Sequence, residues 1–266
     1  MKTHILRLNS NVTNGIGSSP ECAALDMIYT FLLTEHNLNV YNYINIIQIG
    51  SEQDELIRKE GNNVHICIRF PTVEGFDDKP IEERNIMRLE LIHAALLRLD
   101  AWENKLDQSK LQSIKDLILH NNFCFELTYK TFPSVINPGL IGKVLINPQI
   151  DRFNFYVQVE DTNRIICKKL VYSSIPIDTF LDYFFSRGKW RGMTKLTISG
   201  KIKELEIQVD VDTCEITVVN LSRYSNPPTF QVFKYGLTKE EGDKAYADWL
   251  HSLDPSVAGV ISRSQN

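Results

Sequence analysis

The order of helical and extended patterns constrains this chain most. Two helical patterns, Pro80 to about Trp102 and then 107–120, stand side by side, and from Asn122 onward the sequence consists of short extended segments. A doubly wound fold needs strands that alternate regularly with helices, and this order lacks that alternation. Because the connection between the two helical patterns is short, we expect an antiparallel helical hairpin. The sequence therefore predicts an α+β fold, with the hairpin packed on mainly antiparallel sheets.

The flanking segments suggest how the chain divides. Extended patterns at 3–9, 39–50 and 63–71 surround a helical pattern that begins near Pro20, with Ser19 as its N-cap. After the hairpin come strands, a short helical pattern at 176–188, a three-stranded meander and a final helix that opens on a capping box. We predict an N-terminal α/β segment over 1–75, and over 76–266 the helical hairpin, the antiparallel β region and a C-terminal helix.

Composition and charge narrow the class of protein. Hydrophobic residues make up 43% of the 266 residues, enough for a substantial core, and the net charge of -4 argues against a nucleic-acid-binding protein. The five cysteines are odd in number and form no C-x-x-C, which is typical of free thiols in a reducing compartment. The sequence shows no signal-peptide core and no apolar run of membrane-spanning length. We expect a soluble, cytoplasmic protein.

One Glu-x-x-His pair, Glu90 and His93, lies in the longer helical pattern. On a helical wheel His93 falls inside the apolar arc and Glu90 falls at its edge. A carboxylate-bridged di-iron site needs a second such pair, and a zincin site needs a histidine four residues away; the sequence contains neither. We therefore predict no metal site and interpret His93 as a core histidine, with an acid–base pair of His93 and Glu90 as the alternative.

The segment at 14–20, Asn-Gly-Ile-Gly-Ser-Ser-Pro, follows a strand and opens a helix, which is where phosphate-binding loops lie. A P-loop would end in Gly-Lys-Ser/Thr, and a dinucleotide-binding loop would have a third glycine where this chain has Pro20. The pattern favours a flexible loop before a capped helix. An anion or small-molecule site in the Gly15–Ser19 loop, formed by Gly15, Gly17 and Ser18, is the alternative.

A basic segment lies at 186–192. Its three cations, Arg187, Lys189 and Arg191, flank Trp190, and the pattern is similar to a small stacking and phosphate-binding patch. In an acidic chain we favour a basic connection between a helix and a strand. As a binding site it would suit an acidic protein surface as well as a nucleic acid.

A family resemblance covers Val64 to Tyr172. The segments LELIHAALLRLDAW and LQSIKDLILHNNFCFEL, followed by successive strands, resemble a helix-helix-strand pattern of small uncharacterised bacterial proteins. Some of those proteins look like immunity proteins that neutralise a partner toxin. The resemblance carries no catalytic motif, so it implies a protein that binds rather than an enzyme.

These patterns together favour a non-catalytic binding protein without a cofactor, such as an immunity-type inhibitor of another protein. The acidic balance suits the masking of a basic partner, and an exposed edge strand or sheet face could be the docking surface. The alternatives are an enzyme that uses His93 and Glu90, and an anion-binding module at the Gly15–Ser19 loop. The patterns leave the oligomeric state open.

Overall fold

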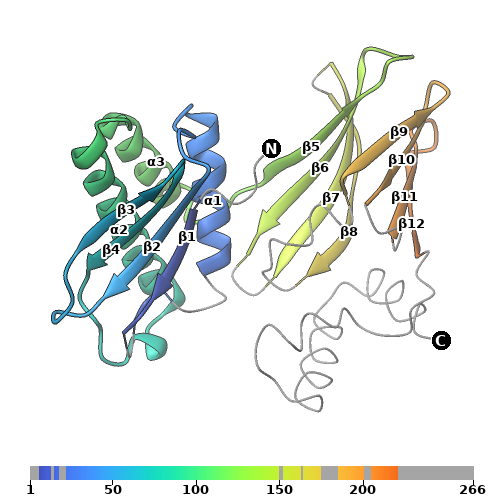
Figure 1. Cartoon of the computed structure of the whole chain (residues 1–266). Helices are drawn as coiled ribbons and strands as arrows, with labels where there is room; N and C mark the ends of the chain where they lie inside the picture. The colour runs from blue at the N-terminus through green and yellow to red at the C-terminus, as the bar shows by residue number, and fades with distance from the viewer. Residues whose placement is uncertain are drawn as a thin grey trace. The chain divides into compact units, whose positions relative to one another are not determined.

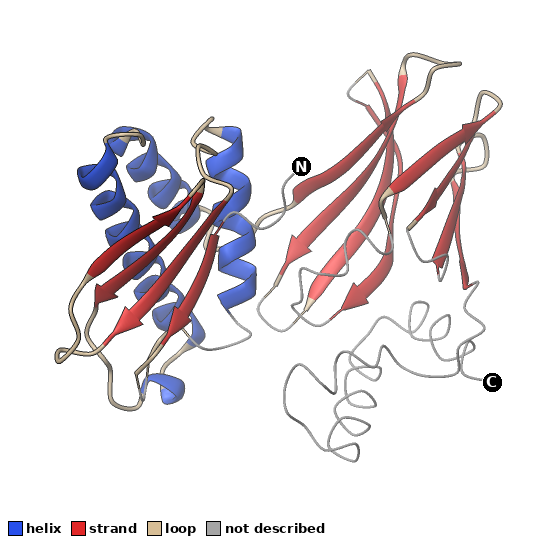
Figure 2. Cartoon of the chain, in the orientation of Figure 1, coloured by secondary structure: helices blue, strands red, loops and turns tan. Residues whose placement is uncertain are grey.

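The computed structural model describes residues 6–12, 15–17, 22–149, 152–162, 164–174, 185–200 and 205–220. The chain forms two compact units. Unit 1 consists of Met1–Leu127 with 147–153 and 176–178, and unit 2 consists of the other residues. The division thus falls near residue 127 and not near 75, because the helical hairpin packs on the N-terminal sheet. The predicted α+β class is confirmed (Figure 2).

Unit 1 is built on a four-stranded sheet with the order β1-β2-β4-β3. Its strands are β1 (Leu6–Ser10), β2 (Tyr43–Ile49), β3 (Leu56–Glu60) and β4 (Asn63–Arg69). The pairs β1–β2 and β2–β4 are parallel, and β3 pairs with β4 antiparallel. The sheet beneath the helical hairpin is therefore mixed, whereas the antiparallel pairing that the sequence suggests predominates in unit 2.

Three helices cover one face of this sheet (Figure 2). They are α1 (Cys22–Glu35), α2 (Ile81–Glu103) and α3 (Gln108–His120), and a short 3-10 turn, η1 (Phe76–Asp78), precedes α2. The carboxylate of Asp107 caps α3 by accepting a hydrogen bond from the Lys110 N–H at 3.2 Å. The predicted helical hairpin is present as α2 and α3.

The core of unit 1 lies between the helices and alternate residues of the strands. Ile44 and Ile46 of β2, and Val64 and Ile66 of β4, are fully buried on the helix side. From α2, the buried side chains opposite them are Leu89, Ile92, Leu96 and Leu99. The period of two in the strands leaves the intervening residues on the face that the three helices do not cover.

Unit 2 contains two four-stranded sheets with the orders β5-β6-β7-β8 and β12-β11-β10-β9 (Figure 1). The first consists of β5 (Leu127–Pro133), β6 (Leu140–Pro148), β7 (Phe153–Asp161) and β8 (Arg164–Ser174). The strand ends at Leu127, 147–148 and Phe153 belong to unit 1. The second consists of β9 (Arg187–Arg191), β10 (Lys195–Ser199), β11 (Leu205–Asp210) and β12 (Glu215–Asn220). All pairings in the second sheet are antiparallel, which confirms the predicted meander.

The two sheets of unit 2 pack face to face. Phe155 of β7 lies 5.1 Å, centroid to centroid, from the ring of Phe185 just before β9, and both are fully buried. The sheets approach closely at Gly142, where an added Cβ would lie 2.2 Å from Cδ2 of Leu196. Unit 2 is therefore a β-sandwich whose inner faces carry the apolar residues of each strand.

Some expected elements lie outside the described residues. These are most of the helix expected at 176–188, the C-terminal helix and the N-cap at Ser19. Two strands differ from the sequence interpretation: β3, whose segment has little apolar alternation, and β9, where we expected a connection. Among the described helices, none combines the length and apolarity needed to cross a bilayer.

Candidate functional site

Glu90 and His93 lie in the interface between α2 and α3. The Glu90 carboxylate forms an ion pair with Lys115 of α3 at 2.7 Å. His93 is 5% exposed. Its pKa is influenced by a hydrogen bond with the Gln112 side chain and by the charge of Lys115, both on α3. Both members of the pair therefore contact the second helix of the hairpin.

The environment of His93 favours its neutral form. Burial lowers the pKa of His93 below its ordinary value, and the positive charge of Lys115 acts in the same direction. The carboxylates of Glu90 and Asp116 and the Gln112 side chain oppose this shift. Neither His93 nor Glu90 is among the residues that line the cavity described below. A general base needs access to a substrate, and this buried interface offers His93 little.

The loop after β1 is packed against the sheet and is held by hydrogen bonds. Ile16 is fully buried, and its N–H donates to Oε1 of Gln48 at 2.8 Å. The N–H of Gly15 donates to the carbonyl of Val12 at 3.1 Å. A Cβ at Gly17 would lie 2.5 Å from the carbonyl oxygen of Asn9, so close packing accounts for this glycine. The N–H groups of Gly15 and Ile16 are thus engaged by protein acceptors, and Ser18 lies outside the described residues.

A buried arginine that the sequence analysis did not single out holds this loop. Arg88 of α2 is fully buried, and its Nε donates to the carbonyl of Ile16 at 3.0 Å. Its Nη1 donates to Oδ1 of Asn85 at 3.3 Å, and its guanidinium lies 5.1 Å from the ring centroid of Phe76. Arg88 therefore joins the loop after β1, the start of α2 and the 3-10 turn.

The basic segment at 186–192 is the edge strand β9. The side chains of Arg187, Lys189 and Arg191 are exposed and lie on one face of the strand. Trp190 points to the other face, where its indole Nε1 donates to the carbonyl of Phe132 at 2.8 Å. The three cations and the aromatic ring therefore do not form one stacking surface.

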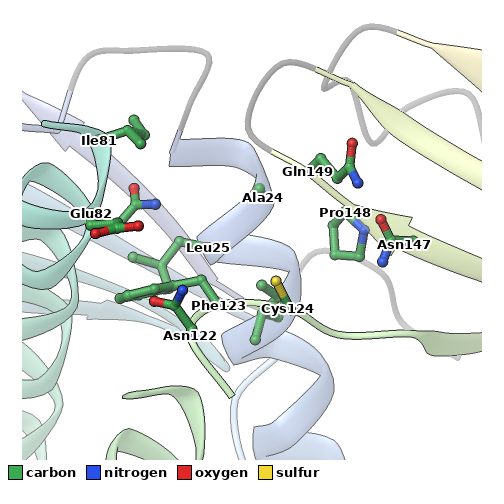
Figure 3. A pocket seen from close by; sticks show the side chains of 12 residues that line it. Ala24, Leu25, Ile81, Glu82, Asn122, Phe123, Cys124, Asn147, Pro148 and Gln149 are labelled. Carbon is green, nitrogen blue, oxygen red and sulfur yellow. The ribbon is translucent and has the colours of Figure 1, made fainter. Parts of the chain in front are cut away.

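Unit 1 contains a cavity beside α1 and the first turn of α2 (Figure 3). Its lining residues are Ala24, Leu25 and Ile28 from α1, Ile81, Glu82 and Asn85 from α2, Asn122–Cys124 after α3, and 147–149. Glu82 is the only acidic or basic side chain in that lining. Cys124 adds a thiol to the same lining, and the other lining side chains are apolar groups and amides.

The face of the unit 1 sheet opposite the helices carries several rows of side chains, and we name the eight residues of two adjacent rows the open face. The strand register places the polar row Arg7, Asn45, His65 and Arg58 side by side across all four strands. The same register gives a second, largely apolar row of Asn9, Ile47, Cys67 and Leu56. Leu56 is 55% exposed.

Hydrogen bonds order the polar part of the open face. The Asn9 amide donates from Nδ2 to Oδ1 of Asn45 at 2.5 Å, and Nδ2 of Asn45 lies 3.3 Å from Nδ1 of His65. The ring of Tyr43 meets the His65 ring edge to face, with centroids 6.3 Å apart. These contacts link three neighbouring strands, so the side chains are held in place before any partner binds.

One local sequence signal indicates part of the open face. The segment Tyr43–Ile49 reads Tyr-Ile-Asn-Ile-Ile-Gln-Ile, and its alternation already places Asn45 and Ile47 on the same side. The neighbours of these residues on β1, β3 and β4 depend on the strand order, which no local pattern contains.

The described residues include no group of three or more His, Cys, Asp and Glu side chains that could hold a metal ion. No family model matches the chain, no curated protein matches it, and no solved structure is similar to it. The surfaces and their chemistry are therefore the basis for a functional interpretation.

Proposed function

We propose that this chain is a non-catalytic binding protein that docks a partner protein on the open face, as an immunity protein does when it neutralises a toxin. One observation carries the proposal: β1, β2 and β4 form parallel pairs, yet the three helices lie on only one side of them. Parallel sheets are usually covered on both faces. A partner would supply the missing layer.

The chemistry of the open face indicates the kind of surface that would fit it. Ile47, Cys67 and Leu56 form an apolar stripe, and such a stripe on an exposed sheet marks an interaction site. Arg7 and Arg58 lie at the two ends of the adjacent row and are exposed, and Arg58 forms an ion pair with Glu60 of the same strand at 2.7 Å. The complementary surface would therefore be apolar, with a carboxylate placed to meet Arg7. The net charge of -4 belongs to the whole chain, and it would attract a basic partner at longer range without setting the chemistry of the contact surface.

The size of the sheet indicates how the interface would be organised. Four strands at about 4.8 Å spacing and five residues at about 3.3 Å each cover roughly 300 Å². A stable interface buries about 800 Å² on each partner. The open face would thus be the centre of the interface, where most of the binding energy is concentrated, and the surrounding loops would form its rim.

The test uses co-expression of the chain with the product of the adjacent gene. We expect the chain to restore growth when that product is toxic, and the two proteins to elute as one complex in size-exclusion chromatography. Leu56→Arg should weaken the complex by about tenfold or more, because it places a long cation in the apolar stripe. The matched control is Ile165→Arg in unit 2, since Ile165 is 54% exposed and also lies on a strand.

Two results would contradict the proposal. Failure of the adjacent gene product to bind would remove the immunity-type role. Equal weakening by Leu56→Arg and Ile165→Arg would show that the open face is not the docking surface. Circular dichroism of both variants would establish that each is folded.

A further inference from the structure

We propose that strand β9 binds an acidic, extended segment of a partner protein as an added strand of the β12-β11-β10-β9 sheet. The proposal shares with the proposed function only the premise that the chain binds protein. It concerns unit 2 and not the open face of unit 1, so either proposal can fail without the other.

Charge is the first reason. The guanidinium and ammonium groups of Arg187, Lys189 and Arg191 make no ion pair within the described parts of the chain, and all three side chains are exposed. Many other basic side chains have a carboxylate partner, as Lys115 has Glu90 and Lys143 has Glu160. The row on β9 is therefore an uncompensated positive charge on an acidic protein.

Spacing is the second reason. Alternate residues of a strand lie about 6.7 Å apart, so the three cations form a ladder along β9. Residues directly opposite each other on neighbouring strands have Cβ atoms about 5 Å apart. Carboxylates on alternate residues of an added strand would thus each reach one cation of the ladder.

The edge position of β9 is the third reason. Among the described strands β9 pairs only with β10, so one side of its backbone has no strand partner there. On its inner side β9 is held firmly: a Cβ at Gly188 would lie 2.3 Å from the Phe132 ring, and the Trp190 indole donates to the Phe132 carbonyl. A strand edge that is ordered before binding loses little conformational entropy when another strand pairs with it.

The negative charges on the same face of the sheet favour a peptide over a nucleic acid as the ligand of β9. Glu206 and Asp210 of β11 lie on the side that carries the cations, because the register places them beside Ser199 and Lys195, which lie opposite Arg187 and Arg191. A polyanion crossing this face would meet those carboxylates. A single acidic strand lying along β9 would stay at the positive edge. Trp190, on the inner side, is not available for base stacking.

The test uses the full-length chain and a fluorescently labelled synthetic peptide with glutamate at alternate positions between threonine and valine. A peptide with glutamine in place of glutamate is the charge control, and oligothymidylate is the nucleic-acid control. We expect anisotropy to show that the acidic peptide binds and that salt weakens it. Hydrogen exchange should slow at β9 amides and stay unchanged at β11, which is already paired on both sides.

Matched variants locate the site. Lys189→Glu should weaken peptide binding by about tenfold, because it removes one attraction and adds one repulsion. Arg164→Glu makes the same change in net charge at an exposed residue of β8 and should change the affinity by less than about twofold. Leu56→Arg in unit 1 should leave peptide binding unchanged.

Several results would overturn the proposal. These are equal affinity for the glutamine peptide, tighter binding of oligothymidylate, or equal losses in Lys189→Glu and Arg164→Glu. Absence of peptide binding together with aggregation of an uncharged variant, Lys189→Thr, would show that the cations only protect the edge from self-association.

Discussion

Replacing Glu103 by glutamine should make unit 1 less stable at neutral pH and should remove part of its sensitivity to acid. Glu103, at the end of α2, accepts a hydrogen bond from the Tyr41 hydroxyl at 2.7 Å and pairs with Lys59 and with Lys105. Lys59 is the largest cause of a lowered pKa, and these contacts bring the pKa of Glu103 to about 2. The cluster connects α2 to β3 and to the segment before β2.

The contribution of Glu103 to the free energy of unfolding depends on pH, because its pKa differs between the folded and the unfolded chain. The pKa of Glu103 is lower in the folded protein than its ordinary value of 4.5, so the stabilisation is complete above pH 4.5 and is lost as the pH falls towards 2. At about 1.4 kcal/mol per pKa unit, the shift from 4.5 to about 2 would correspond to at most about 3.5 kcal/mol. Because Glu103 lies close to water, screening reduces this, and we expect roughly 1 kcal/mol.

The assay is urea denaturation from pH 7 to pH 2, followed by the NMR signal of the Ile92 methyl group. Ile92 is buried in α2, so its signal reports on unit 1 without contributions from unit 2. The Glu103→Gln variant should be less stable than wild type by roughly 1 kcal/mol at pH 7, and the two should converge near pH 2. Glu60→Gln, whose side chain is 58% exposed, is the control. Parallel curves for Glu103→Gln and wild type would refute the reasoning.

Two further substitutions test the cores. His93→Leu should reduce the loss of stability below pH 6.5. Burial and the charge of Lys115 lower the pKa of His93 in the folded protein, so protonation of His93 favours the unfolded chain. The slope of the unfolding free energy against pH should fall by up to about 1.4 kcal/mol per pH unit in the variant, and an unchanged slope would contradict this environment of His93. Phe155→Ala should destabilise unit 2 by about 3–5 kcal/mol, because the ring is fully buried against Phe185. Urea denaturation followed by the NMR signals of the Leu196 methyl groups, which are buried in unit 2, measures the loss. Ile165→Ala, at a residue that is 54% exposed, is the control and should change stability by less than about 1 kcal/mol.

Local periodicity accounts for the parts of the fold that the sequence predicted. The apolar spacing of 80–102 and 107–120 specified α2 and α3, and the period of two in 205–220 specified the last strands of the meander. Segments without a clear period were not recognised. Residues 56–60 form β3 because they pair with β4, and 187–191 form β9 because they pair with β10 and pack on Phe132.

The candidate sites, too, could be predicted from the sequence only in part. From the sequence we could list Glu90, His93 and the basic segment as unusual residue combinations, but their neighbours come from other segments: Lys115 beside Glu90, and Phe132 beside Trp190. The open face could not be found in this way. Its polar row combines Asn45 with His65, which lie twenty residues apart.

The sequence by itself determined the α+β class, the helical hairpin and the meander, because hydrophobic periods of 3.6 and 2 act over a few neighbouring residues. The tertiary structure alone decided that the hairpin packs on the N-terminal sheet, and that β9 is an edge strand of its sheet. It also decided that one face of a largely parallel sheet remains without helices. These features depend on strand order and on which apolar faces meet, and those are contacts between residues far apart in the chain.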